Sequence, residues 1–215
     1  MELAINSLPF LWQGLLITLE VSFLVVVFSL AIGVVLGVGV TYGPAWVYWP
    51  IRLYSDFMRG IPILVLLFSV YYGFPAIGIN LNNFWAAVVA MSAFKVAHVI
   101  EIIRGAIQSI NVGQTDAGKS IGLTFVQRLL YVIFPQAVRR FLPPWINAVT
   151  EAVKGTSLIS LIGVVDLMLE IQKVIGRTYE PMPLYVMGAI IYFLINYNLS
   201  AVSRGLERRF AYIRE

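Results

Sequence analysis

The segment Gly113–Ser120 reads GQTDAGKS, which satisfies the phosphate-loop pattern G-x-x-x-x-G-K-[ST] at every position. That pattern binds nucleotide phosphates only where a buried strand leads into the loop and a helix leads out, because the loop amides must be free to cradle the phosphates. The residues before it, HVIEIIRGAIQSINV, instead have the character of the end of a membrane helix. We therefore interpret the match as a coincidence and expect this chain to bind no nucleotide or other cofactor.

The composition of the whole chain is that of an integral membrane protein. Of the 215 residues, 60% are hydrophobic and only 12% are charged, and the mean hydropathy is +0.85. A soluble domain has about 25% charged residues. Cysteine is absent, which excludes disulfides and thiolate metal sites. The N-terminal stretch MELAINSLPFLWQG lacks the basic residue of a cleavable signal, so we expect the first span to be retained.

Five apolar regions are candidates for membrane spans, each of which requires about 20 residues. The uncharged run from Gly60 to Phe94 is too long for one span, and the turn formers of FPAIGINLNN divide it. The fourth region contains LPPW and KGTS, which predict a kinked or discontinuous helix. The expected fold is therefore all-α with five transmembrane helices, in one domain covering residues 1–215: Val21–Val40, about Phe57–Tyr72, about Phe84–Ile107, about Val138–Val165 and Pro181–Ser203.

The distribution of basic residues predicts the topology. Five spans put the two termini on opposite sides, and this arrangement gathers 11 of the 15 basic residues on one side: Arg52, Arg59, Arg104, Lys119, Arg128, Arg139, Arg140, Arg204, Arg208, Arg209 and Arg214. Cytoplasmic loops are enriched in Lys and Arg, so we expect the N-terminus outside and the C-terminus inside. The loop of about residues 109–137 is then cytoplasmic.

This loop and its flanks carry a resemblance to a known family. GQTDAGKSIGLTFVQRLLYVIFPQAVRRFLPP is similar to the EAA loop in the membrane subunits of bacterial ABC importers, especially permeases for polar amino acids. Those typically read G-Q-x-E-A-A-x-x-x-G-L followed by I-x-P-Q-A. The chain departs from that pattern at Asp116, where the family has Glu, and at Gly118, where it has a second Ala. Further similarities are RGIP (Arg59–Pro62), EIIRGAIQS (Glu101–Ser109) and KGTSLISLIGV (Lys154–Val164).

The resemblance implies a permease subunit in a bacterial inner membrane, not an enzyme. It implies a second permease subunit, identical or homologous, with which this chain lines a pathway by alternating access. Two separate ATPase subunits would hold the ATP and Mg, and an extracytoplasmic binding protein would deliver the substrate; no nucleic acid is expected. The alternatives are an ATP-independent channel, which predicts flow without ATP, and a membrane enzyme. For an enzyme the sequence offers no HExxH motif, no cysteine and one histidine.

The resemblance also implies that the loop contains a coupling helix, which docks in a groove of the ATPase subunit. The apolar residues Ile121, Leu123 and Phe125 have few charges beside them, which suits a partner groove. We expect Gly118 and Gly122 to leave one helix face bare. Asp116 would favour the helix dipole, or simply cap the helix, and Gly122 would otherwise be a helix-weakening turn residue. The predicted contact residues are Asp116, Ala117, Gly118, Lys119, Ser120, Ile121, Gly122 and Leu123.

Ionisable side chains inside spans cost about 2.5–3.5 kcal/mol each, so each predicts a role. Glu151 lies in the interrupted fourth region, and transporters bind substrates where a helix is interrupted. A carboxylate there favours a cationic substrate, so we predict import of basic amino acids (arginine, lysine or histidine), with another small polar solute as the alternative. Glu151 would otherwise pair with Lys154, three residues later. The predicted substrate-binding residues are Glu151, Asp166, Thr150 and Asn147.

Three further patterns give expectations about helix packing and metal binding. Glu101 and Arg104, three residues apart, are expected to form an ion pair with a structural or gating role. His98 forms H-x-x-E with Glu101, but two candidate ligands do not make a metal site, and we expect none. We also expect close packing against a neighbouring span at three glycines of the first span: Gly33, Gly37 and Gly39.

Overall fold

The computed structural model describes residues 2–210, with the side chains of residues 7–208, and every regular element in that part of the chain is helical. The expected all-α fold is confirmed. Arg214, one of the basic residues used to predict the topology, lies outside the described residues. In chain order the elements are α1 (Glu2–Tyr42), α2 (Ala45–Gly60), α3 (Ile63–Ala76), α4 (Asn83–Gln108), α5 (Val112–Ser120), α6 (Phe125–Gln127), the π-helix η1 (Arg128–Ile133), α7 (Phe134–Gly155), the 3-10 helix η2 (Thr156–Ile162), α8 (Leu167–Thr178) and α9 (Pro181–Phe210).

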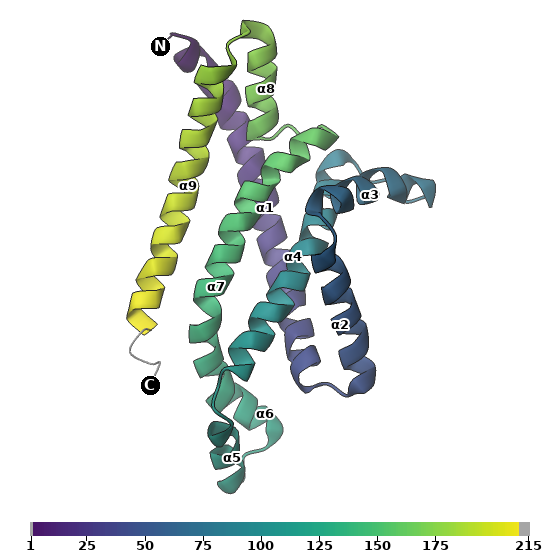
Figure 1. Cartoon of the computed structure of the whole chain (residues 1–215), viewed down its shortest axis with the longest axis vertical. Coiled ribbons are helices and arrows are strands. Elements are labelled where there is room, and N and C mark those ends of the chain that lie inside the picture. Colours follow the sequence, from purple (N-terminus) through teal and green to yellow (C-terminus); the bar gives the residue numbers. More distant parts are fainter. Residues whose placement is uncertain (1, 211–215) are drawn as a thin grey trace.

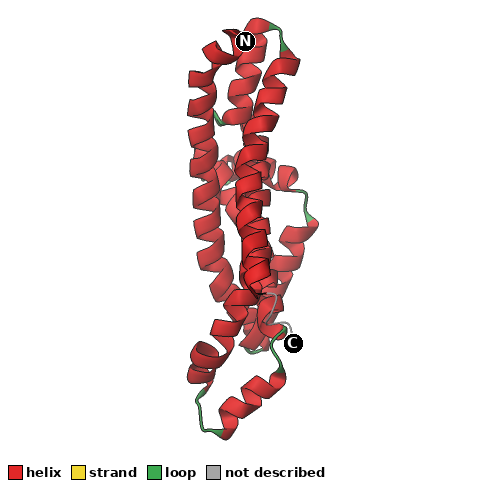
Figure 2. Cartoon of the chain, turned by 90° about the vertical axis from the view of Figure 1, so that its left-hand side faces the viewer, coloured by secondary structure: helices red, strands yellow, loops and turns green. Residues whose placement is uncertain are grey.

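The long helices form an elongated bundle with two distinct ends. The start of α1 and the end of α9 lie at opposite ends (Figure 1). The α1–α2 turn, α5 and α6 lie at the same end as the end of α9, whereas α8 lies at the other end (Figure 1). The segment with α5 and α6 projects beyond the bundle (Figure 2). The fold therefore gathers at one end the α5–α6 segment and the end of α9, two of the segments that sequence reasoning assigned to one side of the membrane, whereas α2 runs from that end towards α3 (Figure 1).

Among the described residues, three helices are long and apolar enough to cross a membrane: α1 over Ser7–Tyr42, α4, and α9 over Pro181–Arg208. A fourth crossing is possible if α2 and α3 together form one span, but these helices meet at an angle of 104°. The second span predicted over about Phe57–Tyr72 therefore contains this bend, with its first residues at the end of α2 and the remainder in α3. The helix breaks at Ile61 and Pro62, because the residue before a proline is disfavoured in helical conformation.

The predicted fourth span differs from the structure in the place of its interruption. α7 continues through Pro143 and Pro144, so the break expected at LPPW is absent. The chain leaves α-helical geometry only after Gly155, at KGTS, where η2 begins. We attribute the continuity of α7 to its packing against α4 and α9, since tertiary contacts can hold a helix across proline. The sequence reasoning also missed α8, which lies between the fourth and fifth predicted spans.

Close packing of α1 on α4 forms the centre of the bundle. A Cβ atom on Gly33 would lie 2.5 Å from Cγ1 of Val99, and one on Gly37 would lie 2.7 Å from Cβ of Ile103. Gly39 faces α2 instead, where a Cβ would lie 3.2 Å from Cδ1 of Ile51. The expectation of close helix packing at these three glycines is confirmed. In lipid the hydrophobic effect does not drive helices together, so their association relies on close packing. Small residues at such positions allow the helix backbones to approach.

Candidate functional site

One side of α7 carries polar residues that stay exposed in the described structure. Its exposed positions recur three or four residues apart and so share one helix face: Arg140, Pro144, Asn147, Glu151 and Lys154. The remaining sides of α7 pack mainly against α4 and α9. We call these five residues the open face of α7. A row of polar and charged side chains in an otherwise apolar bundle requires contact with water, substrate or another subunit.

Glu151 on this face forms an ion pair with Lys95 of α4. Oε2 of Glu151 lies 3.2 Å from Nζ of Lys95, and the two side chains are 61% and 7% exposed. The glutamate carboxylate is thus accessible, whereas the lysine emerges from the packed interior. The alternative pairing of Glu151 with Lys154 is not formed in the described chain. Sequence reasoning did not identify this pair, because Lys95 lies 56 positions away from Glu151 in the chain.

The other predicted substrate residues lie in three different environments. Asn147 is exposed one turn before Glu151, on the same face. Thr150 is buried, and its hydroxyl donates to the carbonyl oxygen of Ile146 at 3.0 Å. Asp166 is fully buried as the N-cap of α8: its Oδ1 accepts from the amide of Leu169 at 3.0 Å. The structure therefore brings Asn147 and Glu151 together and separates them from Asp166.

α4 presents an open face beside that of α7, formed by partly exposed residues at helical spacing that include Phe94 and His98. The ammonium group of Lys95 lies 5.9 Å from the centroid of the Phe94 ring, and the rings of Phe94 and His98 are 4.6 Å apart. Glu151, Lys95, Phe94 and His98 thus form a continuous cluster across α7 and α4. It combines an acidic, a basic and two aromatic groups at the edge of the bundle.

Towards the end of the bundle that holds α5, Glu101 is surrounded by arginines. Oε2 of Glu101 lies 2.6 Å from Arg104, which confirms the predicted pair. Oε1 lies 3.1 Å from Arg52 and 3.7 Å from Arg59, both on α2. The hydroxyl of Tyr54 adds a hydrogen bond to the carbonyl oxygen of Ala93 at 2.6 Å. These contacts fix α2 to α4 immediately before the bend into α3. Sequence reasoning missed the two α2 arginines, because only the fold brings them near Glu101.

GQTDAGKS lies within α5 and does not form a phosphate-cradling loop. Lys119 pairs with Asp116 at 3.0 Å, and the hydroxyl of Ser120 donates to the carbonyl oxygen of Asp116. The amide of Gly113 donates to the side chain of Asn111, the N-cap of the helix. Since the described segment is helical, most of its amides are engaged within the helix rather than turned towards a ligand.

The predicted coupling helix is shifted relative to the sequence-based assignment. The helix covers Val112–Ser120, so three of the predicted contact residues, Ile121, Gly122 and Leu123, lie beyond its end, and Gly122 has a left-handed φ of +79°. The amide of Leu123 donates to the carbonyl oxygen of Gly118 at 3.0 Å, and that of Gly122 to Lys119 at 2.9 Å, which is a Schellman motif. Gly122 is therefore a turn residue and leaves no helix face bare.

Gly118 is also not bare, because the side chain of Arg128 covers it. A Cβ on Gly118 would lie 3.0 Å from Cδ of Arg128, whose guanidinium donates to the carbonyl oxygen of Leu123 at 2.6 Å. The exposed apolar surface of this segment lies elsewhere, in large side chains that are 58–76% exposed: Val112, Ile121, Val126 and Tyr131. Such a surface at the projecting end of the bundle is typical of a protein contact.

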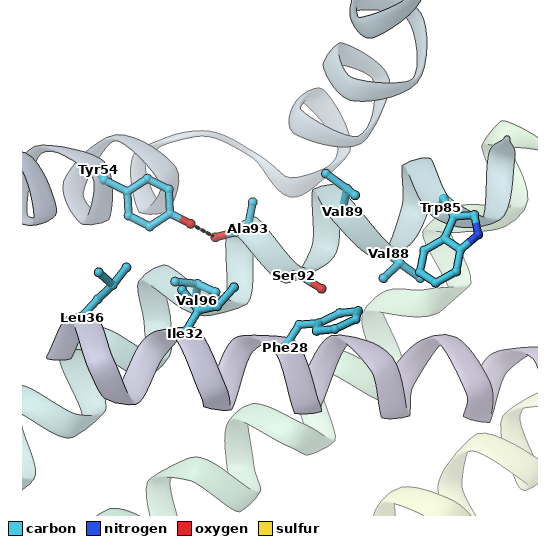
Figure 3. Close-up of a pocket in the computed structure, with 10 residues that line it drawn as sticks. All are labelled: Phe28, Ile32, Leu36, Tyr54, Trp85, Val88, Val89, Ser92, Ala93 and Val96. Carbon is cyan, nitrogen blue, oxygen red and sulfur yellow. Dashed lines mark hydrogen bonds between the residues drawn. The ribbon is translucent and has the colours of Figure 1, made fainter. Parts of the chain in front are cut away.

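A cavity of about 520 Å³ between α1, α2 and α4 is a poor site for a charged solute (Figure 3). Its lining is aliphatic and aromatic apart from the polar groups of Tyr54, Ser92 and Trp85. The Tyr54 hydroxyl already donates to Ala93. No charged residue lines the cavity, so the open faces of α4 and α7 remain the better candidate for polar substrates.

Comparisons with known proteins agree on one class. Residues 29–212 match the family model described as binding-protein-dependent transport system inner membrane component. The chain is 36% identical to the probable amino-acid ABC transporter permease YckA of Bacillus subtilis, over 98% of this chain and 93% of that protein. It is 34% identical to the probable glutamine ABC transporter permease GlnP of the same organism, over 95% of each. Further relatives are named for cystine and arginine transport.

The fold comparison gives the same result. A crystal structure of an amino acid ABC transporter with histidines superposes with a TM-score of 0.90 at 31% identity, covering 96% of both chains.

Proposed function

Because the chain belongs to the family of binding-protein-dependent transport system inner membrane components, as a multi-pass permease subunit of an amino-acid ABC importer, we propose that its open face of α7 binds basic amino acids during transport. The observation that carries this proposal is the Glu151 carboxylate, which is 61% exposed on that face. Among the described side chains only Lys95 engages this carboxylate, through Oε2, which leaves Oε1 available to accept from an ammonium or guanidinium group. Asn147, one turn away, supplies a further polar group on the same face.

The rest of the proposal concerns the membrane crossings and the partner subunits. The five crossings are α1, the bent pair α2–α3, α4, α7 with η2, and α9, with the N-terminus outside. A second permease subunit completes the pathway opposite the open faces of α4 and α7. Two ATPase subunits supply ATP hydrolysis, and an extracytoplasmic binding protein delivers the substrate. The grouping of the basic segments at one end of the bundle supports this orientation (Figure 1).

The segment of α5 and α6 is proposed to dock the ATPase. It projects beyond the bundle (Figure 2). The side chains of Ile121 and Val126 in this segment are exposed. An exposed apolar surface of this kind is stabilised when a partner groove covers it. Among the predicted contact residues, Ile121 and Lys119 are exposed and fit this role, whereas Gly118 and Gly122 act on the shape of the segment.

The test of Glu151 must separate substrate binding from the neutralisation of Lys95. Glu151→Gln keeps the side-chain volume and removes the charge. In the complex reconstituted with its ATPase and binding protein, ATP-dependent arginine uptake should fall about tenfold or more, since a charge-assisted hydrogen bond contributes about 1.5–3 kcal/mol. Glutamine uptake should fall much less. The double variant Lys95→Met with Glu151→Gln removes the unpaired lysine as well.

If Glu151 serves only to balance Lys95, the double variant should recover folding and arginine uptake together. If Glu151 binds substrate, the double variant should fold normally and still import arginine poorly. Normal arginine uptake by a well-folded Glu151→Gln protein would refute the proposed role. Preferential uptake of glutamine or cystine by the parent would favour the alternative, another small polar solute. Uptake that continues without ATP would favour a channel.

A further inference from the structure

His98 presents a hydrogen-bond acceptor on the open face of α4. Its Nδ1 lies 3.0 Å from the carbonyl oxygen of Phe94, one helical turn earlier. A carbonyl oxygen can only accept, so Nδ1 carries the proton, and in the neutral ring Nε2 keeps an acceptor lone pair. Nε2 has no hydrogen-bond partner within the described part of the chain, and the ring is partly exposed. The fold thus fixes one tautomer and leaves its acceptor atom available.

The position of the ring is fixed by its neighbours. The Phe94 ring lies 4.6 Å from it, and the Lys95 ammonium lies 5.9 Å from Phe94 and 3.2 Å from Glu151. The charged groups that act on the ring come from three helices: Lys95 on α4, Arg59 on α2 and Glu151 on α7. His98 therefore presents an acceptor near the Glu151 carboxylate, and the side chains of Lys95 and Phe94 lie between the two groups.

We propose that Nε2 of His98 is a specificity-determining acceptor in the pathway, which binds N–H groups at the end of a substrate side chain. Guanidinium, ammonium and amide groups all supply such a donor. The inference rests on the proposed function, because it requires the substrate to pass along the open faces of α4 and α7. A substrate without a side-chain donor leaves the acceptor unpaired, and sites that hydrogen-bond a substrate group discriminate strongly against analogues that lack it.

Protonation of the ring gives this acceptor a pH dependence. The imidazolium form has two donors and no acceptor, and it adds a positive charge near Lys95 and Arg59. Binding of a cationic side chain should therefore weaken in acid. Glu151, the acidic group acting on the ring, reduces the repulsion but does not restore the lone pair.

Two substitutions of His98 test the role of Nε2. His98→Phe keeps an aromatic ring against Phe94 and removes the acceptor. His98→Gln places a carbonyl oxygen near the position of Nε2. Equilibrium binding of labelled arginine, and of norleucine as a matched amino acid without a side-chain donor, is measured on the purified permease–ATPase complex without the binding protein. We expect the arginine Kd to rise about tenfold in His98→Phe and to stay within about twofold of the parent in His98→Gln, with norleucine unchanged in both.

The pH series adds a readout that a structural role of His98 would not give. From about pH 8 to about pH 5, arginine affinity should fall more in the parent than in His98→Gln, which has no titrating ring. Equal arginine affinity in the parent and His98→Phe would overturn the inference, and so would an equal loss of arginine and norleucine. Failure of the proposed function would give a different result: the parent complex would bind no arginine, or would bind it independently of Glu151. That outcome would overturn both the proposed function and the inference about His98.

Discussion

Substitution of Gly37 by alanine tests the packing of α1 against α4. The added Cβ would lie 2.7 Å from Cβ and Cγ2 of Ile103 and 3.2 Å from the carbonyl oxygen of Ile100. Carbon atoms in favourable contact are about 3.5–4.0 Å apart, so the helices must separate by about 1 Å. Ile103 is β-branched and has essentially one χ1 rotamer in a helix, so its side chain cannot turn away.

The expected magnitude follows from two opposing effects. Overpacking of this kind costs about 1–3 kcal/mol, while alanine gains about 1 kcal/mol over glycine in helix propensity. The net loss should lie between about 0 and 2 kcal/mol, which lowers the melting temperature by up to about 8 °C for a chain of this size. Gly176 in α8 is the matched control, because a Cβ there meets no atom within 4 Å. Gly176→Ala should raise the melting temperature by about 1–4 °C.

Thermal unfolding of the three proteins is compared in one detergent and at one heating rate, since unfolding of membrane proteins is often irreversible. Adding Ile103→Ala to Gly37→Ala should cost less than the sum of the two single changes, because the clash is removed with the isoleucine side chain. If Gly37→Ala is as stable as Gly176→Ala, the close approach of α1 and α4 at this position is refuted.

Three further predictions concern the projecting segment and the arginine cluster. Gly122→Val should loosen the loop after α5, because a β-branched residue is strained at φ +79°, whereas Gly122→Asn should be tolerated. Limited proteolysis measures the difference, and equal digestion of the two variants would contradict the prediction. Ile121 is 76% exposed, so Ile121→Ser should leave the isolated subunit stable but weaken its affinity for the ATPase about tenfold or more, and unchanged co-purification would argue against docking there. Glu101→Gln leaves three arginines without their shared carboxylate and should lower the free energy of unfolding by about 1–3 kcal/mol, after allowance for the 30–39% exposure of the arginine side chains. A melting temperature equal to that of the parent would show that the cluster contributes nothing to stability.

The sequence alone determined those features that depend on local composition. Apolar length predicted α4 within one residue at each end, as well as about half of α1 and most of α9, because a helix in lipid must satisfy its own backbone hydrogen bonds. The glycine positions of α1 and the Glu101–Arg104 pair were equally predictable, since spacing on one helix fixes which residues share a face. The membrane-helix context of Gly113 was sufficient to discount its phosphate-loop pattern.

Only the tertiary structure decided which charges meet and where helices end. Local rules predicted a break at LPPW and left open a pair between Glu151 and Lys154, but α7 continues through the prolines and Glu151 pairs with Lys95 of α4. Asp166 was predicted to bind substrate, whereas the packing of α8 against α1 buries it as a helix cap. In each case the deciding partner lies on another helix. Burial raises the cost of an unpaired polar group, so the arrangement that satisfies such groups is selected by the whole bundle rather than by adjacent residues.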